Sequence, residues 1–341
     1  MQHLNGHKSN AISIQKEIDD LERKLKDAKQ RLNSLNGAPS PDQNLSHPES
    51  TPLAIPHALL LLSDSALPLG SFAYSSGLES YLAHNKQLQP RQQSNPQLRT
   101  NPIASFRLFL SFSLASQAST TLPYVLAAHR HPDQLETLDN DLDASTPCTV
   151  TRRASIAQGL ALLGVWERAF KDAYTNTHTK PTTTTTTTTS TSTSTSGDGA
   201  NPPSNPPTTS QAAINALSIF STSLKTTYSN PSSSHPNNHL NGHLPPLWAV
   251  VCAAMDIDIT STAYVYMLNH AKAVLSAAVR ASVMGPYQAQ AVLASRWLRE
   301  MIEWRIRTQW VVTPEEAGQV VPTVDLWVGR HELLYSRIFN S

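Results

Sequence analysis

Three histidines near the middle of the chain have a spacing that could serve metal binding. His235, His239 and His243 lie four residues apart, which would place them on one face of a helix. Pro236 and Gly242 lie among them and disfavour a helix at this point. Histidine is common in polar linkers, so we interpret the three as linker residues. A weak, labile metal site in a loop is the alternative.

The motifs of the common enzyme classes are missing from the sequence. None of the twelve glycines is followed by lysine, so the chain has no phosphate-binding P-loop. It has neither a GxGxxG nor a GxSxG motif. The segment from His331 to Tyr335 begins like a zincin motif, but a tyrosine stands in place of the second zinc-binding histidine. The sequence therefore predicts a protein that is not an enzyme and has no tightly bound cofactor or metal.

Helical periodicity dominates the sequence. Apolar residues recur at helical spacing in residues 156–170, 264–278 and 293–304. Alternation typical of a strand is limited to residues 309–312, which is too short to matter. We therefore predict an all-α fold with a single helical domain over residues 53–341.

Composition marks three segments as separate from this domain. Residues 1–52 form an N-terminal extension, in which residues 11–36 have the heptad pattern of a short coiled-coil-like amphipathic helix and a Pro/Ser/Asn linker follows. A lone amphipathic helix is the alternative. Residues 175–210 contain an unbroken threonine run, and residues 229–246 are rich in Ser, Pro, Asn and His. Both inserts have too few apolar residues to offset chain entropy, and we expect them to be disordered insertions.

Net charge, cysteine content and the lengths of the apolar stretches limit the possible cellular compartment and the possible classes of partner. The formal net charge is +1, which gives no overall attraction to nucleic acid or to an anionic membrane. The two cysteines, Cys148 and Cys252, lie far apart, which argues against a disulfide framework and favours a reducing compartment. The N-terminus lacks the apolar segment of a secretory signal. The most apolar stretch, residues 247–257, is too short to span a membrane. We expect a cytoplasmic protein.

Three blocks, in order along the chain, carry a family resemblance. Residues 60–79, LLLSDSALPLGSFAYSSGLE, resemble the N-terminal signature of the UreF family of urease accessory proteins. Residues 276–280, SAAVR, are followed by a glycine and a glutamine at the family spacing, and residues 330–341, RHELLYSRIFNS, resemble its C-terminal block. Locally, a proline and a glycine break the first block into helix, loop and helix. The chain is identified as similar to this family over residues 54–341, the two inserts excepted.

The resemblance implies a function as well as a fold. It implies an all-helical homodimer that acts as a non-enzymatic chaperone in the nickel insertion and maturation of urease. The implied partners are a UreD/UreH-type scaffold, a UreG-type GTPase and urease apoprotein, and nickel is handled by the assembly. The extension and the inserts lie outside the family pattern, as in a eukaryotic, fungal member. The alternative is a helical coiled-coil adaptor unrelated to urease. A serine hydrolase would need a base and an oxyanion hole, which the sequence does not show.

The same blocks supply the candidate site residues. In the last block, an aromatic/arginine/aromatic cluster has the composition of an interface hot spot, and we predict that it docks a partner and has little reason to order within the chain. This cluster comprises Tyr335, Arg337 and Phe339. In the first block, a set of residues is predicted to make core or dimer contacts rather than ligand contacts: Pro68, Gly70, Phe72, Tyr74 and Glu79.

One charge stands out in an otherwise apolar helix. Arg280 closes the SAAVR block, and its guanidinium must reach a carboxylate, a carbonyl or water. The residue types leave two interpretations open, a structural ion pair within the fold and an ion pair with a partner.

Overall fold

A computed structural model describes residues 23–24, 57–92, 101–175, 208–229 and 240–340. The chain divides into two units, Met1–Ala54 and Ile55–Ser341. In the first unit only Arg23 and Lys24 are described, and both are helical and exposed. The rest of the predicted helix over 11–36 and its linker lie outside the described residues.

The predicted all-α class is confirmed, because the described part of Ile55–Ser341 contains helices and no strand. Its α-helices are α2 (His57–Ser63), α3 (Leu78–Gln92), α4 (Pro102–Arg130), α5 (Leu135–Ser145), α6 (Thr149–Val165), α7 (Lys171–Thr175), α8 (Thr209–Ser229), α9 (Leu244–Ala254), α10 (Ile259–Arg280), α11 (Pro286–Leu293), α12 (Arg296–Gln309) and α13 (Pro322–Arg330). The short 3₁₀ turns are η1 (Ser71–Ala73), η3 (Pro132–Gln134), η5 (Pro314–Glu316) and η6 (His331–Leu333), and one π-helical turn, η4 (Trp166–Phe170), joins α6 to α7.

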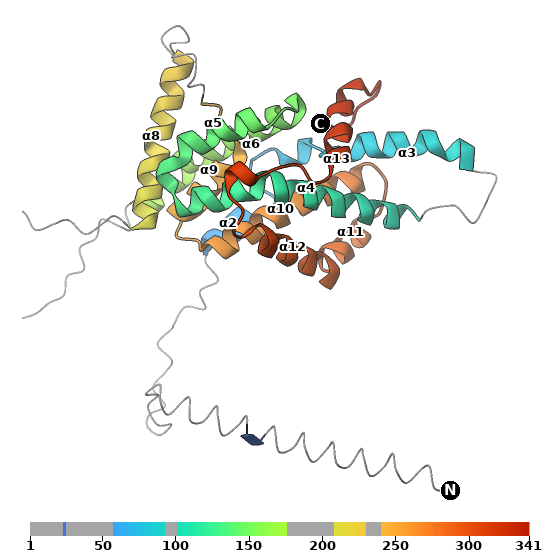
Figure 1. The fold of residues 1–341 in the computed structure, drawn as a ribbon, viewed down its shortest axis with the longest axis horizontal. Helices are drawn as coiled ribbons and strands as arrows, with labels where there is room; N and C mark the ends of the chain where they lie inside the picture. The colour runs from blue at the N-terminus through green and yellow to red at the C-terminus, as the bar shows by residue number, and fades with distance from the viewer. Residues whose placement is uncertain (1–22, 25–56, 93–100, 176–207, 230–239, 341) are drawn as a thin grey trace, which may run out of the picture. The chain divides into compact units, whose positions relative to one another are not determined.

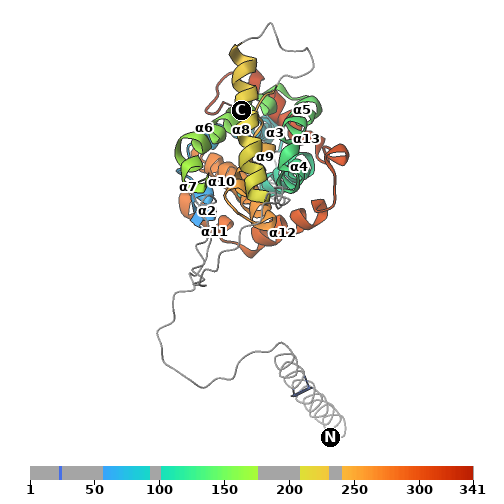
Figure 2. The same cartoon turned by 90° about the vertical axis from the view of Figure 1, so that its left-hand side faces the viewer.

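Two helices form the centre of the domain. The long helix α4 packs against α9, α10 and α12, while α9 also packs against α6 and α8, as Figures 1 and 2 show. Every residue from Pro245 to Ala254 is buried. A helix that is apolar on all faces is stable only when other helices cover it completely. The composition of α9 therefore dictates its central position.

Side chains cap the N-terminal ends of the two long helices α4 and α10. The Asn101 side chain accepts a hydrogen bond from the Ile103 N–H at 3.0 Å and starts α4. Asp258 caps α10 in the same way through the Ser261 N–H at 2.9 Å. Such caps satisfy N–H groups that have no partner within the helix.

The predicted insert over residues 229–246 extends too far at its C-terminal end. Leu240 is buried, His243 is fully buried, and α9 already begins at Leu244. Pro245 and Pro246 lie in the first turn of α9. Backbone N–H groups in this turn have no acceptor within the helix, so proline, which has no N–H group, is favourable there. Likewise α7 ends at Thr175 and α8 begins at Thr209, inside the insert predicted over 175–210. The remaining residues of both inserts lie outside the described part.

Candidate functional site

The signature loop, residues 64–77, joins α2 to α3 through η1. Gly70 and Gly77 have φ angles of 70° and 84°, a left-handed backbone that favours glycine. A Cβ atom at Gly77 would lie 3.0 Å from Cγ2 of Val328, so glycine also permits close approach to α13. Pro68 is exposed in the turn before Gly70. The first family block is thus a tight loop packed against a helix near the other end of the chain.

Arg280, the last residue of α10, contacts both the signature loop and the C-terminal tail (residues 331–340). Its guanidinium donates to the carbonyl oxygen of Phe72, and its Nε donates to the Ser276 carbonyl at 3.4 Å. It also stacks over the Phe339 ring, 4.5 Å from the ring centre. No carboxylate of the described residues pairs with it. Of the two interpretations of Arg280, the intrachain ion pair is replaced by contacts with carbonyl oxygens and an aromatic ring, and the ion pair with a partner stays a prediction.

Glu79, in the first turn of α3, holds the tail from the other side. Its carboxylate accepts hydrogen bonds from the backbone N–H groups of Ile338 at 2.7 Å and Phe339 at 3.3 Å. His331 Nε2 lies 2.9 Å from the same carboxylate, and the His331 side chain is fully buried. The Asn340 N–H donates to the Ala73 carbonyl at 2.8 Å. The role of His331 was missed at the sequence level, because the pairing spans some 250 residues of chain.

These contacts correct the expectation that the tail has little reason to order within the chain. The tail is ordered by its own chain, and Phe339 is only 5% exposed. The tail leaves helical geometry after Leu333, so Tyr335 and Phe339 do not share a helical face. Tyr335 is fully exposed and Arg337 is exposed. The predicted aromatic/arginine/aromatic cluster is thus divided into one internal anchor and two outward-facing residues.

The signature loop also presents an apolar side chain to solvent. Phe72 is 66% exposed and so does not pack into the core of its own chain, while Tyr74 is half-buried. The dimer contacts expected as the alternative for Phe72 stay a prediction. We define the tail–loop surface as the exposed apolar residues of these two connected segments: Phe72, Leu333, Tyr335 and Ile338. Large exposed apolar side chains on a backbone held by hydrogen bonds are typical of a preformed protein-binding surface.

A cavity of about 440 Å³ lies beneath the signature loop, between α4 and α10. On α4 its wall follows helical spacing: Ser113, Ser116, Gln117, Thr120 and Thr121. Facing this stripe, the fully buried Tyr266 accepts from the Gln117 amide at 2.6 Å and donates to Thr121 Oγ1 at 2.9 Å. The hydroxyl and amide groups of this wall can form hydrogen bonds with water.

His270 contributes to the same wall. Its Nε2 lies 2.8 Å from Ser113 Oγ, and desolvation by burial lowers the pKa of the imidazole to about 4. His270 is therefore neutral at pH 7. The polar stripe on α4 was visible in the sequence as hydroxyl and amide residues at positions i, i+3, i+4, i+7 and i+8, but its facing partners were not.

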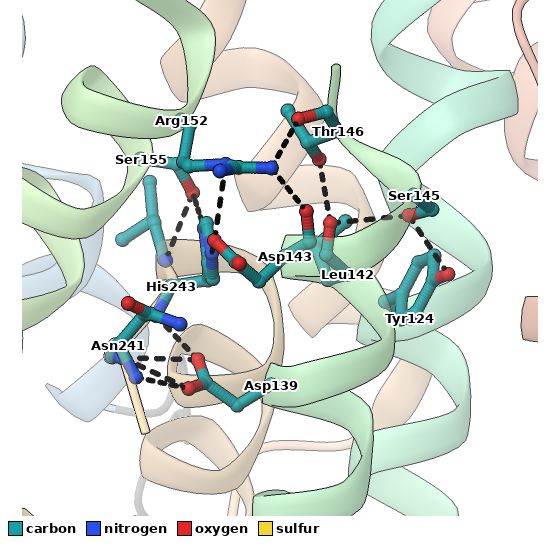
Figure 3. A network of polar contacts seen from close by, with 12 residues as sticks. Tyr124, Asp139, Leu142, Asp143, Ser145, Thr146, Arg152, Ser155, Asn241 and His243 are labelled. Carbon is teal, nitrogen blue, oxygen red and sulfur yellow. Dashed lines mark hydrogen bonds and ion pairs between the residues drawn. The ribbon is translucent and has the colours of Figure 1, made fainter. Parts of the chain in front are cut away.

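A second polar cluster surrounds His243, as Figure 3 shows. His243 Nδ1 lies 3.0 Å from Ser155 Oγ, and its Nε2 lies 3.1 Å from Asp143 Oδ1. The residue types are those of a serine hydrolase triad, but the serine contacts Nδ1 and the aspartate Nε2, which is the reverse of the arrangement in the triad. The Leu244 N–H also donates to Ser155 Oγ, and the next two residues are prolines without an N–H for an oxyanion hole. The cluster is better suited to holding the start of α9 than to catalysis.

Asp139 completes this anchor from α5 (Figure 3). Its fully buried carboxylate accepts from the backbone N–H groups of Asn241 at 2.8 Å, Gly242 at 3.0 Å and His243 at 2.6 Å. Gly242 has a φ of 82°, and a Cβ at Gly159 would lie 2.1 Å from the Gly242 carbonyl oxygen. His243 is thus a core residue, whereas His235 and His239 lie outside the described residues.

Neither a cluster of metal-binding side chains nor a membrane-spanning helix occurs among the described residues. Within them, no three His, Cys, Asp or Glu side chains come together as a possible metal site. None of the helices there has the length and apolar character needed to cross a membrane.

Comparison of the sequence with known protein families identifies a match. The UreF family model matches residues 101–296, which run from before α4 to the first residue of α12 and include Arg280. The chain belongs to the UreF family. The signature loop and the tail lie outside the part that the UreF model matches.

Individual UreF relatives extend over most of the chain. It is 30% identical to an uncharacterized urease accessory protein UreF-like of Schizosaccharomyces pombe, over 84% of this chain and 97% of the relative. It is 26% identical to urease accessory protein F of Oryza sativa subsp. indica, over 82% of each chain. It is 23% identical to urease accessory protein 6 of Cryptococcus neoformans, over 84% of this chain and 96% of the relative.

Proposed function

We propose that this chain is a cytoplasmic urease accessory protein that promotes nickel insertion into urease by binding other proteins rather than by catalysis. Its family supports the urease role, and the tail–loop surface supports the binding mode. The proposed partners are a UreD/UreH-type scaffold, a UreG-type GTPase and urease apoprotein, with the chain acting as a homodimer. Nickel is the cargo of the assembly and is not held tightly by this chain.

The observation that carries the proposal is the preformed tail. Glu79 binds the tail backbone and Arg280 contacts the Phe339 ring and the Phe72 carbonyl, while Tyr335 and the Phe72 side chain remain exposed. A surface ordered before binding loses little conformational entropy when a partner docks. Exposed aromatic and arginine side chains are the residue types that dominate binding energy at protein interfaces.

The test is complementation. The wild-type chain is expected to restore urease activity in cells that lack the native gene and to co-purify with the scaffold. The double variant Phe72→Ala/Tyr335→Ala is expected to lose both properties while remaining folded. Ile219→Ala, which changes an equally exposed apolar residue on α8, serves as the control. Normal urease activation by the double variant would refute the docking role.

The non-catalytic part of the proposal has its own test. The purified chain is expected to hydrolyse neither GTP nor ATP above background, because no glycine-rich loop in the sequence can cradle a triphosphate. Turnover that follows the protein peak through a second purification would refute it. Light scattering of the same sample tests the homodimer.

A further inference from the structure

Three arginine–tryptophan pairs lie on α4, on α12 and at the C-terminal end of α12. The guanidinium of Arg107 lies 5.6 Å from the centre of the Trp297 ring, and that of Arg130 lies 5.3 Å from Trp310. Arg305 stacks 4.4 Å from Trp304. Such pairs occur about once per 70–80 residues, so three within one short segment are a local concentration. We call these residues the arginine–tryptophan seam.

Charge pairing divides α12 into two halves. In its first half, Arg296 pairs with Glu300 at 2.6 Å and Arg299 with Glu303 at 3.6 Å. In its second half, Arg305 and Arg307 have no carboxylate of the described residues within ion-pairing distance. The same holds for Arg107 and Arg130 on α4. The acids of α12 are therefore already paired. Among the cations of the seam, Arg130 donates to the Trp310 carbonyl at 2.8 Å, and none of them pairs with a carboxylate of the described residues.

The guanidinium of Arg305 has an unsatisfied N–H group, because no carboxylate of the described residues lies near it. Its Nε is shielded from solvent and has no hydrogen-bond partner, and burial lowers the pKa of its guanidinium. A guanidinium N–H that is shielded from solvent and has no acceptor is unfavourable in the isolated chain. The neighbouring Trp304 is 49% exposed although it is a large aromatic residue. Both features are relieved if another surface covers them and brings an acceptor.

The geometry of the pair indicates which acceptor fits. A guanidinium that stacks on an aromatic ring keeps its in-plane N–H groups available, and these match a carboxylate in a bidentate arrangement. The exposed Arg307 adds a second unpaired cation on the same helix. The seam is thus complementary to a surface with at least two neighbouring carboxylates.

We propose that the arginine–tryptophan seam is a second docking surface, which takes an acidic surface of another protein of the urease maturation assembly. The proposal rests on the urease role proposed above. It concerns a part of the molecule built from α4 and α12, whereas the tail–loop surface is built from the signature loop and residues 331–340.

The experiment compares two double variants of the full chain that remove the same charge from one helix. Arg305→Gln/Arg307→Gln removes the unpaired cations, and Arg296→Gln/Arg299→Gln removes the paired ones. Binding of the purified scaffold, GTPase and urease apoprotein is measured by biolayer interferometry at about 0.05 M and about 0.3 M salt. The first variant is expected to bind at least one partner about tenfold more weakly at low salt, with a smaller difference at high salt. The second is expected to stay within about threefold of wild type.

Several results would overturn the proposal. Unchanged binding of all three partners by the Arg305→Gln/Arg307→Gln variant would do so, as would an equal loss in the Arg296→Gln/Arg299→Gln variant. A change from dimer to monomer in light scattering would assign the seam to a second copy of the chain. Stronger binding after removal of residues 1–54 would assign it to the chain's own extension. If the first variant does not fold, Arg307→Glu decides, because Arg307 is exposed and a reversed charge must still weaken binding to an acidic surface.

The experiments distinguish a refutation of the seam as a docking surface from a refutation of the proposed urease role. A wild-type chain that binds none of the three partners and does not restore urease activity refutes the urease role. A wild-type chain that does both, with seam variants that behave like it, refutes only the seam.

Discussion

Arg280 and Phe339 are in contact, with the guanidinium 4.5 Å from the centre of the phenylalanine ring, although 59 positions separate them in the sequence. The same guanidinium donates to the Phe72 carbonyl in the signature loop. One side chain therefore joins the three blocks on which the family resemblance rests. The tail is an integral part of the fold, and its outward-facing residues can be changed without loosening it.

Phe339 is expected to contribute to stability. Phe339→Ala removes a buried ring and should lower the free energy of unfolding by about 3 kcal/mol. The matched change Tyr335→Ala, at a fully exposed position of the same tail, should alter it by less than about 0.5 kcal/mol. Urea unfolding followed by circular dichroism measures both. Equal effects of the two variants would show that the tail is not docked through Phe339.

Tyr335 is expected to contribute to binding instead. Tyr335→Ala should weaken binding to the UreD/UreH-type scaffold by about 2 kcal/mol, or roughly thirtyfold, because exposed aromatic residues on an ordered backbone make effective anchors. Calorimetric titration with the purified scaffold measures the change. Ile219→Ala on α8 should bind as wild type does, and an unaltered affinity for Tyr335→Ala would contradict the prediction.

Asp139 should contribute more to the stability of the fold than Asp141, two positions further along α5. Asp139→Ala leaves three backbone N–H groups at the start of α9 without their acceptor and should destabilise the fold by about 2–3 kcal/mol. Asp141→Ala, on the exposed side of the same helix, should cost less than about 0.5 kcal/mol. Thermal unfolding of the two variants side by side is the measurement. A similar melting temperature for both would remove the proposed anchor.

The inserts themselves are expected to be dispensable. Deleting residues 182–207, or replacing residues 230–239 with a Gly/Ser segment of equal length, should leave the melting temperature nearly unchanged. Extending the replacement to His243 should lower it by several degrees, because this removes buried contacts to Asp139, Asp143 and Ser155. A loss of stability from the shorter changes would show that the inserts pack against the domain.

His270 should make stability depend on pH in the acidic range. Its pKa is lowered from an ordinary value near 6.5 to about 4, so the unfolded chain binds more protons than the folded chain between these values. The contribution of the neutral histidine is fully present above pH 6.5 and is lost as the pH falls toward 4, by up to about 3 kcal/mol. Urea unfolding at several pH values should show a shallower decline in His270→Asn than in wild type. Parallel curves would contradict the assignment.

The spacing of apolar residues and the positions of proline and glycine were sufficient to predict the fold class. The spacing of apolar residues predicted helices that became α6, α10 and α12, and the helix, loop and helix expected over residues 60–79 became α2, the signature loop and α3. These features are local, since they depend on which residues recur every three or four positions and where proline and glycine interrupt them. The three family blocks were readable for the same reason.

Contacts between distant segments were decided only by the tertiary structure. Low complexity around residue 240 suggested disorder, yet Asp139, about a hundred positions away, supplies the acceptor that orders Asn241 to His243. The tail composition suggested a free segment, yet Glu79 and Arg280 supply its partners. The sequence does not indicate which distant carboxylate will accept a hydrogen bond from a given backbone N–H group. Nor does it indicate which guanidinium will stack on a given aromatic ring. Local pattern therefore determined which helices form, while packing of distant segments determined which residues anchor the fold and which remain exposed for binding.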